Sequence, residues 1–348
     1  MEPLGIVIII IIILIGFYLA FGVLVVFKAN TELFGKRGED PSNPCYLRFE
    51  DYPFLKRTPY RTGYYGKAIK GYLYQDQRLR DYKGYIILSH GFFGTHVQYL
   101  FDIALLTQEG YLVLAYDQFG AGLSEGKNQE SLATGVYVME NVISDVEKNN
   151  LNRGLPIYLY GHSWGGYSVA GALKNHPEIK GAICRSAPYS PIKAGYDLLK
   201  KVKPGLAYFL APVFSFSCWL VMGKRYLIKG TRGLKKNKDT PVLFIQAKND
   251  DIVLYKDSLA KYYQKHPQKN AKVFLTDKGM HNSLLVENGQ LKYKELVKKF
   301  HEIDRKPDTT KKDQEMNDFL NHLDRVQTYQ YDEETKNEIL SFLDNPKI

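Results

Sequence analysis

The sequence is poor in cysteine, and its three cysteines lie far apart. Cys45, Cys184 and Cys218 form no C-x-x-C pair within the 348 residues, so neither a disulfide framework nor a zinc motif is indicated. No other cluster of metal-ligand residues is visible, and we expect no metal or organic cofactor. The sequence also has no internal repeat and no helix-turn-helix, zinc-finger or RNP pattern, which argues against a nucleic-acid partner.

Negative charge is scarce in one segment, and this scarcity makes the whole chain basic. The net charge is +10, and residues 188–240 carry eleven Lys or Arg but only two Asp. Because no nucleic-acid motif accompanies this segment, an anionic surface such as a lipid leaflet is the better candidate partner.

Charge is absent from residues 4–27. As a helix these residues would span about 36 Å, enough for a bilayer core of about 30 Å. A cleaved signal peptide is the alternative, but it would need a basic start and a shorter apolar run. The chain begins Met1-Glu2-Pro3, without Lys or Arg. We therefore expect an uncleaved anchor over residues 1–27, crossing the cell membrane once.

Basic residues follow this apolar run. Lys28, Lys36 and Arg37 favour the cytoplasmic side for the remainder of the chain, by the positive-inside rule. Residues 28–60 contain several prolines among charged residues, and we expect them to form a linker.

Apolar runs and helical stretches alternate beyond the expected linker. The strand-like runs are residues 85–88, 112–116, 157–160, 181–184, 242–246 and 272–275. Helical stretches lie near residues 97–108, 135–148 and 164–175. This alternation predicts a mostly parallel sheet covered by helices on both faces, with residues 64–74 adding antiparallel edge strands. Active sites of such sheets lie at the carboxyl ends of the strands.

One strand-like run passes into a helical stretch with almost no loop. The junction reads Gly161-His162-Ser163-Trp164-Gly165. So sharp a reversal strains the backbone of its central residue and requires small flanking residues. It also lifts the Ser163 hydroxyl to a helix N-terminus, where developing negative charge is stabilised. The pattern is that of a nucleophile elbow.

An acid and a histidine follow later strands. Asp250 comes shortly after the run 242–246, with Asp251 as its rival, and His281 comes after the last run. The other histidines precede that run, flank the serine or lie in the charged C-terminal segment. Serine, acid and histidine in this order are expected for an α/β-hydrolase triad.

These motifs resemble the α/β-hydrolase superfamily, and most closely its serine esterase, monoacylglycerol lipase and serine aminopeptidase branch. The likeness covers roughly residues 60–290 and a final helix near 333–344. It implies an α/β-hydrolase core of residues 61–187 and 241–348, with a helical cap or lid inserted at 188–240. The implied site consists of the nucleophile Ser163, the acid Asp250, the base His281, oxyanion-hole N–H groups of Phe92 and Trp164, and the supporting loop residues His90, Gly91, Gly161, Gly165 and Asp117. The acid loop has Ala247 where the family usually has glycine.

The resemblance implies a serine hydrolase that works through an acyl-enzyme. We expect it to cleave carboxylic esters of small molecules or lipids, such as a monoacylglycerol or a lysophospholipid. A serine peptidase of the same fold is the alternative, although an exopeptidase needs carboxylates to hold a substrate amine and the expected cap has almost none. A catalytically inactive binding protein is a third possibility.

The middle of the expected cap, residues 204–223, carries no charge, and Lys200, Lys201 and Lys203 precede it. Two interpretations stay open: a buried apolar cap with a solvated basic rim, or a lid whose apolar face contacts the membrane. We reject a second transmembrane span, which would divide the core between two strands of one sheet. The polar residues 293–331 are either two short amphipathic helices or a flexible insertion, and we assign them no chemistry.

Overall fold

The computed structural model describes residues 3–40, 44–224 and 227–346. Its centre is an eight-stranded sheet in the order β1-β2-β4-β3-β5-β6-β7-β8. The strands are β1 (Leu55–Tyr64), β2 (Lys67–Asp76), β3 (Gly84–Ser89), β4 (Tyr111–Tyr116), β5 (Ile157–His162), β6 (Gly181–Arg185), β7 (Val242–Ala247) and β8 (Ala271–Thr276). Strands β3 to β8 pair in parallel, and β1 and β2 add the antiparallel edge. The predicted mostly parallel sheet is confirmed.

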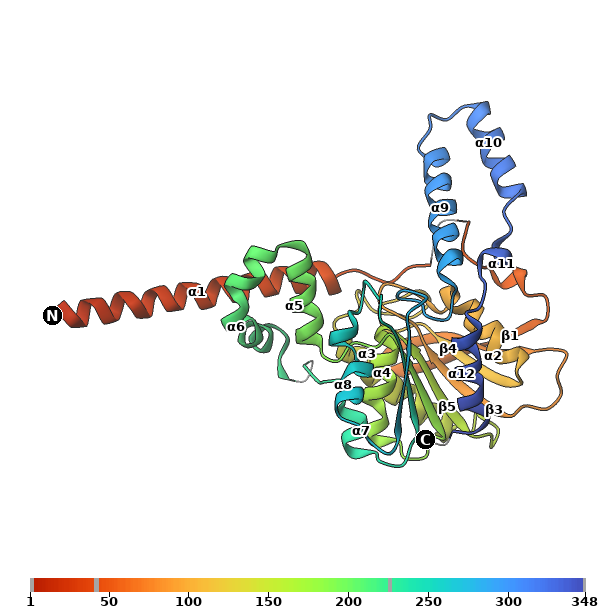
Figure 1. The fold of residues 1–348 in the computed structure, drawn as a ribbon, viewed down its shortest axis with the longest axis horizontal. Helices are drawn as coiled ribbons and strands as arrows, with labels where there is room; N and C mark the ends of the chain where they lie inside the picture. The colour runs from red at the N-terminus through yellow and green to blue at the C-terminus, as the bar shows by residue number, and fades with distance from the viewer. Residues whose placement is uncertain (1–2, 41–43, 225–226, 347–348) are drawn as a thin grey trace.

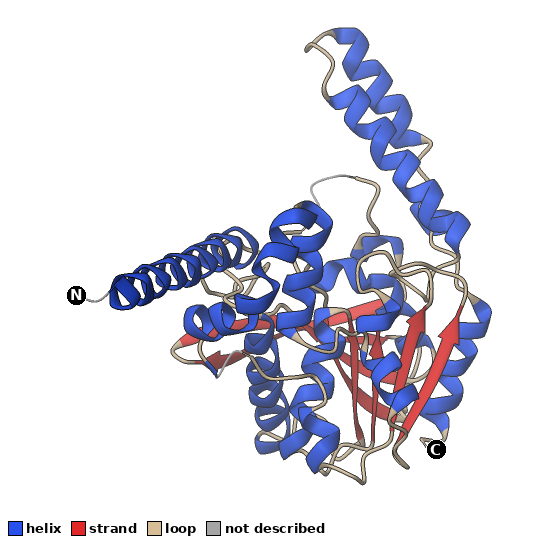
Figure 2. Ribbon diagram, turned by 60° about the vertical axis from the view of Figure 1, so that its left-hand side comes forward, coloured by secondary structure: helices blue, strands red, loops and turns tan. Residues whose placement is uncertain are grey.

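Helices cover both faces of the sheet (Figure 2). One face packs against α3 (Leu132–Lys148), α4 (Trp164–Ala172) and α8 (Leu259–Lys265), and the other against α2 (Leu100–Gln108) and α12 (Glu333–Asp344). Successive strand residues alternate between these two cores, and both are apolar, because β3 to β7 are buried on both sides. This is why the strands appear in the sequence as continuous apolar runs.

Two elements extend into the segment expected to be a linker, residues 28–60. Helix α1 (Pro3–Phe34) continues seven residues beyond the expected anchor, and β1 begins at Leu55. Pro59 suggested a linker, but β1 is an edge strand, where a missing N–H costs no ladder hydrogen bond. The connection between helix and sheet is therefore residues 35–54.

Helix α1 leads away from the globular part of the chain, and α5 (Pro191–Val202) and α6 (Pro204–Met222) lie beside its inner half (Figure 1). Both α1 and α6 are long and apolar enough to cross a membrane, judged by length and composition. Residues 1 and 2 of the expected anchor lie outside the described part of the chain.

The two apolar helices pack closely against each other. A β-carbon placed on Gly22 would lie 2.9 Å from Ser217 Oγ and 3.0 Å from Val213 Cγ2. The Tyr18 hydroxyl donates to the backbone carbonyl of Phe209 at 2.5 Å. The small residue at position 22 thus permits the two backbones to approach.

The outer face of α6 is exposed and apolar, so the interpretation of a fully buried cap does not fit. Its exposed large side chains are Tyr208, Phe216, Trp219 and Leu220, whereas the Phe209 ring lies against the Tyr18 and Phe21 rings of α1. The strands on either side of the insertion, β6 and β7, are hydrogen-bonded neighbours. A single crossing by α6 would place these neighbours on opposite sides of a membrane, so the chain must return to the side from which it left.

Helix α7 (Arg232–Lys236), expected within the cap, belongs to the core instead. Leu234 is fully buried, and a β-carbon on Gly233 would lie 1.9 Å from the carbonyl oxygen of Ala170 in α4. The cap is therefore shorter at its C-terminal end than the expected 188–240.

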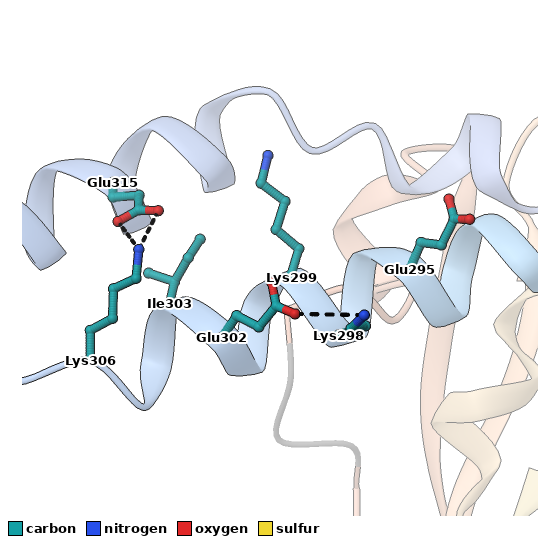
Figure 3. Close-up of a pocket in the computed structure, with 7 residues that line it drawn as sticks. All are labelled: Glu295, Lys298, Lys299, Glu302, Ile303, Lys306 and Glu315. Carbon is teal, nitrogen blue, oxygen red and sulfur yellow. Dashed lines mark hydrogen bonds and ion pairs between the residues drawn. The ribbon is translucent and has the colours of Figure 1, made fainter.

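Of the two alternatives for residues 293–331, the structure has helices. Helices α9 (Glu287–Asp304) and α10 (Thr310–Asn321) form a hairpin that projects from the sheet domain (Figure 1). A pocket between them is lined mainly by Lys and Glu side chains (Figure 3). Lys306 forms an ion pair with Glu315 across this pocket at 2.6 Å.

Candidate active site

Ser163 lies at the turn between β5 and α4, and its backbone is strained. Its φ is 56° and its ψ is −119°, a conformation that residues with a side chain rarely adopt. A β-carbon on Gly161 would lie 2.3 Å from the carbonyl oxygen of Gly165, and one on Gly165 would lie 1.9 Å from that of Ser89. Only glycine fits at either position, which explains the two glycines of the elbow.

His281 contacts Asp250 and not Asp251. The His281 Nδ1 lies 3.0 Å from Asp250 Oδ1 and 2.9 Å from Oδ2, whereas Asp251 is exposed. Asp250 is 3 % exposed, and its Oδ1 also accepts from the backbone N–H groups of Ile252 and Val253 at 2.9 Å. These bonds fix the carboxylate so that it can orient the imidazole of His281.

A chain of hydrogen bonds joins three loops at this site. The Gly91 N–H donates to the Tyr99 hydroxyl at 2.8 Å, and the hydroxyl lies 2.8 Å from His162 Nδ1. His162 Nε2 lies 2.9 Å from the backbone carbonyl of His281. A carbonyl only accepts, so Nε2 carries the proton, Nδ1 accepts, and Tyr99 donates to it. The donors therefore all point the same way, from the Gly91 N–H through Tyr99 and His162 to the His281 carbonyl. These bonds link the loops of Gly91, Ser163 and His281.

The two histidines that flank the site are buried and neutral. Burial lowers the pKa of His162 well below its ordinary value, and the charges of His281 and Arg185 act in the same direction. Burial also lowers the pKa of His90. His90 Nε2 accepts from the Gln118 N–H at 2.8 Å, so His90 fixes the loop after β3 to the loop after β4.

Two backbone N–H groups near Ser163 are available for an oxyanion. A β-carbon on Gly91 would lie 3.4 Å from Ser163 Cβ, which brings the Phe92 loop against the serine. Among the hydrogen bonds of the described residues, none uses the Phe92 N–H. Trp164 is the first residue of α4, where an N–H has no intrahelical acceptor.

Asp117 supports the loop after β4 and does not contact Ser163. Its carboxylate accepts from the His96 N–H at 2.8 Å and the Leu123 N–H at 2.9 Å. Burial opposes ionisation of this group, but the hydrogen bonds and charge of His96 hold its pKa below the ordinary value. A β-carbon on Gly122, whose φ is 41°, would lie 2.4 Å from Asp117 Oδ2.

Sequence analysis missed Arg185, which is fully buried at the end of β6. Its carbonyl accepts from the Ser163 N–H at 2.8 Å. Its guanidinium donates to Asn282 Oδ1 at 3.1 Å and to Asp102 Oδ1 at 2.5 Å. Arg185 therefore connects the elbow with the histidine loop, while Asp102 balances its charge. A lone basic residue ending an apolar strand was the available signal.

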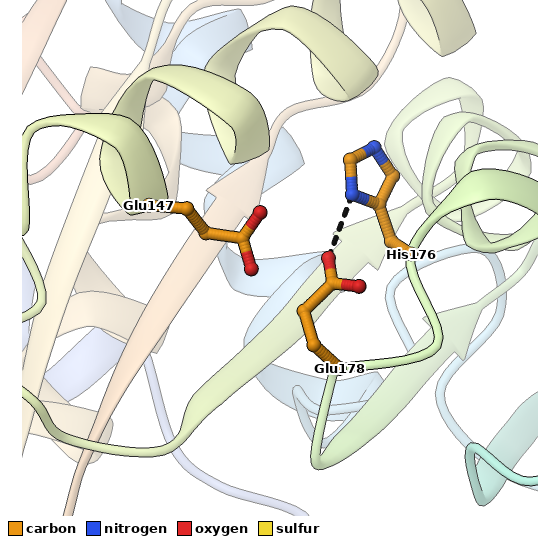
Figure 4. A group of neighbouring side chains, drawn as sticks. All are labelled: Glu147, His176 and Glu178. Carbon is orange, nitrogen blue, oxygen red and sulfur yellow. Dashed lines mark hydrogen bonds and ion pairs between the residues drawn. The ribbon is translucent and has the colours of Figure 1, made fainter.

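Glu147, His176 and Glu178 are the one group in the described chain with the composition of a metal site (Figure 4). His176 Nδ1 lies 2.7 Å from Glu178 Oε1. These residues precede β6 or end α3, so they lie at the amino ends of the strands, opposite Ser163. They take no part in the arrangement around the serine.

Part of the chain is similar in sequence to known hydrolases. The profile described as "Serine aminopeptidase, S33" matches residues 80–218. A proline iminopeptidase of Thermoplasma volcanium is 32% identical over 111 residues, which cover 32% of this chain and 37% of that protein. The monoglyceride lipase of Saccharomyces cerevisiae is 31% identical over 112 residues, which cover 30% of this chain and 35% of that protein. The chain thus spans little more than a third of these relatives.

A solved esterase of Pyrococcus furiosus is similar over most of its length. It superposes with a TM-score of 0.54 and 21% identity, covering 77% of this chain and 98% of the esterase. The chain has the α/β-hydrolase fold. The β5–α4 turn is the place where the α/β-hydrolase fold carries its nucleophile, and the profile match spans this turn and the Phe92 loop.

Replacing Tyr99 with phenylalanine should destabilise the α/β-hydrolase domain by roughly 2 kcal/mol. The change leaves the buried Gly91 N–H without an acceptor and His162 Nδ1 without a donor. Tyr255→Phe is the matched control, because that hydroxyl donates to Gln264 in an exposed position. Denaturant unfolding of both variants measures the difference, and equal midpoints would contradict the hydrogen-bond chain.

Acid should destabilise the folded protein through His90 and His162. Their folded pKa values are lowered, so below the unfolded value of about 6.5 only the unfolded chain takes up these protons. Between pH 7.5 and 5.5 His162 should remove about 1.4 kcal/mol of unfolding free energy, and His90 should add a contribution of the same sign. Unfolding measured at both pH values tests this, with exposed His322→Gln as a control that keeps the full pH dependence and His90→Asn as the variant that reduces it.

Proposed function

We propose that this chain is a serine hydrolase that cleaves carboxylic esters through an acyl-enzyme. The observation that carries the proposal is the pairing of His281 with a buried Asp250, on a loop that His162 joins to the strained Ser163 at a helix N-terminus. The carbonyl of His281 accepts hydrogen bonds from Ser186 Oγ at 2.8 Å and from His162 Nε2. These two bonds fix the His281 loop against the elbow. The supported activity is that of a hydrolase, and the ester class is our inference.

In the proposed reaction the Ser163 oxygen attacks the ester carbonyl carbon while His281 Nε2 takes the hydroxyl proton. Asp250 holds the imidazole and stabilises its charged form. The N–H groups of Phe92 and Trp164 bind the tetrahedral oxyanion, each contributing about 3 kcal/mol. His281 then returns its proton to the leaving alcohol. Water then attacks the acyl carbon while His281 takes its proton, and His281 gives that proton to the Ser163 oxygen as its bond to the acyl carbon breaks and the acid leaves.

An ester substrate is favoured over a peptide with a free amine. The relatives include both a proline iminopeptidase and a monoglyceride lipase, so sequence similarity does not choose. Helices α5 and α6 carry a single carboxylate, Asp197. Burial and the neighbouring Asp257 raise the pKa of Asp197 to about 6, and two helices with one carboxylate offer little to hold a substrate ammonium.

A membrane-held, lipid-like ester is the substrate class that α1 and α6 favour. The apolar side chains of α1 are exposed for most of its length, and the outer face of α6 continues this surface. Lys203 begins α6 and Lys224 follows it, and both are exposed. Cations at the edge of an apolar surface suit anionic headgroups, at about 1 kcal/mol each. We therefore propose that α1 anchors the chain, with its catalytic domain on the cytoplasmic side, and that α6 lies in the bilayer surface.

Ser163→Ala, His281→Ala and Asp250→Asn should each remove most turnover of p-nitrophenyl esters while leaving the fold intact. Ser163 and His281 act in one step, so the double variant should be little worse than either single one. The matched control is Asp251→Asn, next to the acid but exposed. Initial rates and labelling by a fluorophosphonate probe measure the effect. Full activity in Asp250→Asn with loss in Asp251→Asn would remove Asp250 from the proposed site.

Brominated phospholipids should quench the fluorescence of Trp219 in bilayers that contain the full-length protein. The chain has two tryptophans, and Trp164 is buried in the core while Trp219 is 49 % exposed on α6. Trp219→Phe supplies the control, since the remaining Trp164 should be insensitive to bromine. Wild-type emission that is equal in brominated and ordinary lipid would place α6 outside the bilayer.

A further inference from the structure

The end of α1 reaches the active-site loops directly. Phe34, the last residue of the helix, is buried, and its ring lies 5.1 Å from the Phe92 ring in an edge-on arrangement. The Phe34 carbonyl accepts from the Gln129 N–H at 3.2 Å. The Gln129 side chain in turn accepts from the Phe93 N–H at 3.3 Å. Phe34 thus contacts the expected oxyanion loop directly through its ring, and its carbonyl is linked to the same loop through Gln129.

The residues that follow α1 are fixed to the loop after β4. We call residues 34–40 the docking strap. Arg37 donates through Nη2 to the carbonyls of Gly122 and Ser124 at 2.9 Å, and through Nη1 to that of Gly126. Three carbonyls bound by one guanidinium give a rigid junction rather than a flexible link.

A second set of bonds holds the docking strap at Gly38. Its N–H donates to the Gly120 carbonyl at 3.0 Å, and its carbonyl accepts from the Gly122 N–H at 2.9 Å. A β-carbon at Gly38 would lie 2.6 Å from the carbonyl oxygen of Gly94, which belongs to the oxyanion loop. Asp40 accepts from the Thr95 hydroxyl at 2.5 Å. The strap therefore lies between the expected oxyanion loop and the loop after β4.

Phe92 is held between two aromatic rings. The Trp164 ring lies 5.4 Å from it, and the Phe34 ring contacts it at the distance given above. Trp164 belongs to the elbow itself, so one side of Phe92 is fixed by the core. The other side is fixed by α1, and edge-on aromatic contacts restrain orientation as well as position.

We propose that Phe34 is a positioning residue that orients the Phe92 N–H, so that the N-terminal helix is part of the catalytic apparatus rather than a tether. The proposal rests on the serine-hydrolase function proposed above. A donor that stabilises an oxyanion acts only in the transition state, so its displacement lowers kcat and leaves ground-state binding unchanged. Displacements of about 1 Å can cost up to about a hundredfold in rate.

The test uses full-length protein in detergent and a water-soluble ester, p-nitrophenyl butyrate, so that membrane delivery plays no part. Phe34→Ala should lower kcat about tenfold and leave KM within about twofold. Phe34→Leu, which refills most of the space, should recover most of the loss. The control is Phe27→Ala, a residue of the same helix whose ring is exposed.

A second readout separates positioning from general damage. Binding of a trifluoromethyl ketone, which forms an oxyanion on Ser163, should weaken by the same factor as kcat in Phe34→Ala. Binding of the corresponding unreactive ether should not change. Arg37→Lys, which keeps the charge but loses the forked contacts of the strap, should show a smaller loss of the same kind.

Each outcome decides the proposal. A Phe34→Ala protein with the kcat of Phe27→Ala, or one in which ketone and ether binding weaken together, overturns the positioning role. If Phe34→Ala does not fold, the same comparison in Arg37→Lys decides. Wild-type protein that neither turns over esters nor binds the ketone would instead refute the proposed hydrolase function, which is a distinct result.

Discussion

The reversal of the chain at Ser163 is the constraint on which the site depends. A strand that turns into a helix without a loop puts its central residue at positive φ and brings the flanking backbones into contact. Gly165 approaches the carbonyl of Ser89, so the neighbouring strand β3 must end at this level. The loop that follows β3, with His90 and Phe92, is then necessarily beside the serine. The strain is acceptable because the surrounding sheet and helices determine this geometry many times over.

Around this turn the structure binds its loops by buried polar groups, and each such group needs a partner. Arg185 would be costly to bury alone, but Asp102 compensates its charge and Asn282 takes a further donor. The Gly91–Tyr99–His162–His281 chain likewise gives each of its buried polar groups a hydrogen-bond partner, here between uncharged groups. Because these polar groups all have partners in only one arrangement of the loops, the loops are held in that arrangement.

Much of this could be predicted from the sequence, because the signals were local. Apolar runs of strand length predicted the six parallel strands, and the elbow and the order of acid and histidine predicted which loops would meet. The choice between Asp250 and Asp251 was less certain. The two residues are of one type and adjacent, and which side chain points towards His281 depends on the turn after β7. Pro59 wrongly indicated a linker, because proline is also tolerated in an edge strand such as β1. Tyr99 and Phe34 gave no signal, since their roles arise from contacts with residues far away in the chain.

Helix α12 gives the chain an unusual order of assembly. It covers part of the sheet face that α2 also covers, with Ile339, Phe342 and Leu343 buried there beside β6 and β7. During synthesis at roughly 5–20 residues per second, about 150 residues separate the end of β6 from the start of α12. For roughly 7–30 seconds, the part of this face that α12 later covers stays exposed, although α1 and α2 have already left the ribosome. Whatever holds α1 in that interval also keeps an unfinished apolar sheet surface close to it, and shielding of that surface becomes a requirement of biosynthesis rather than of the folded protein.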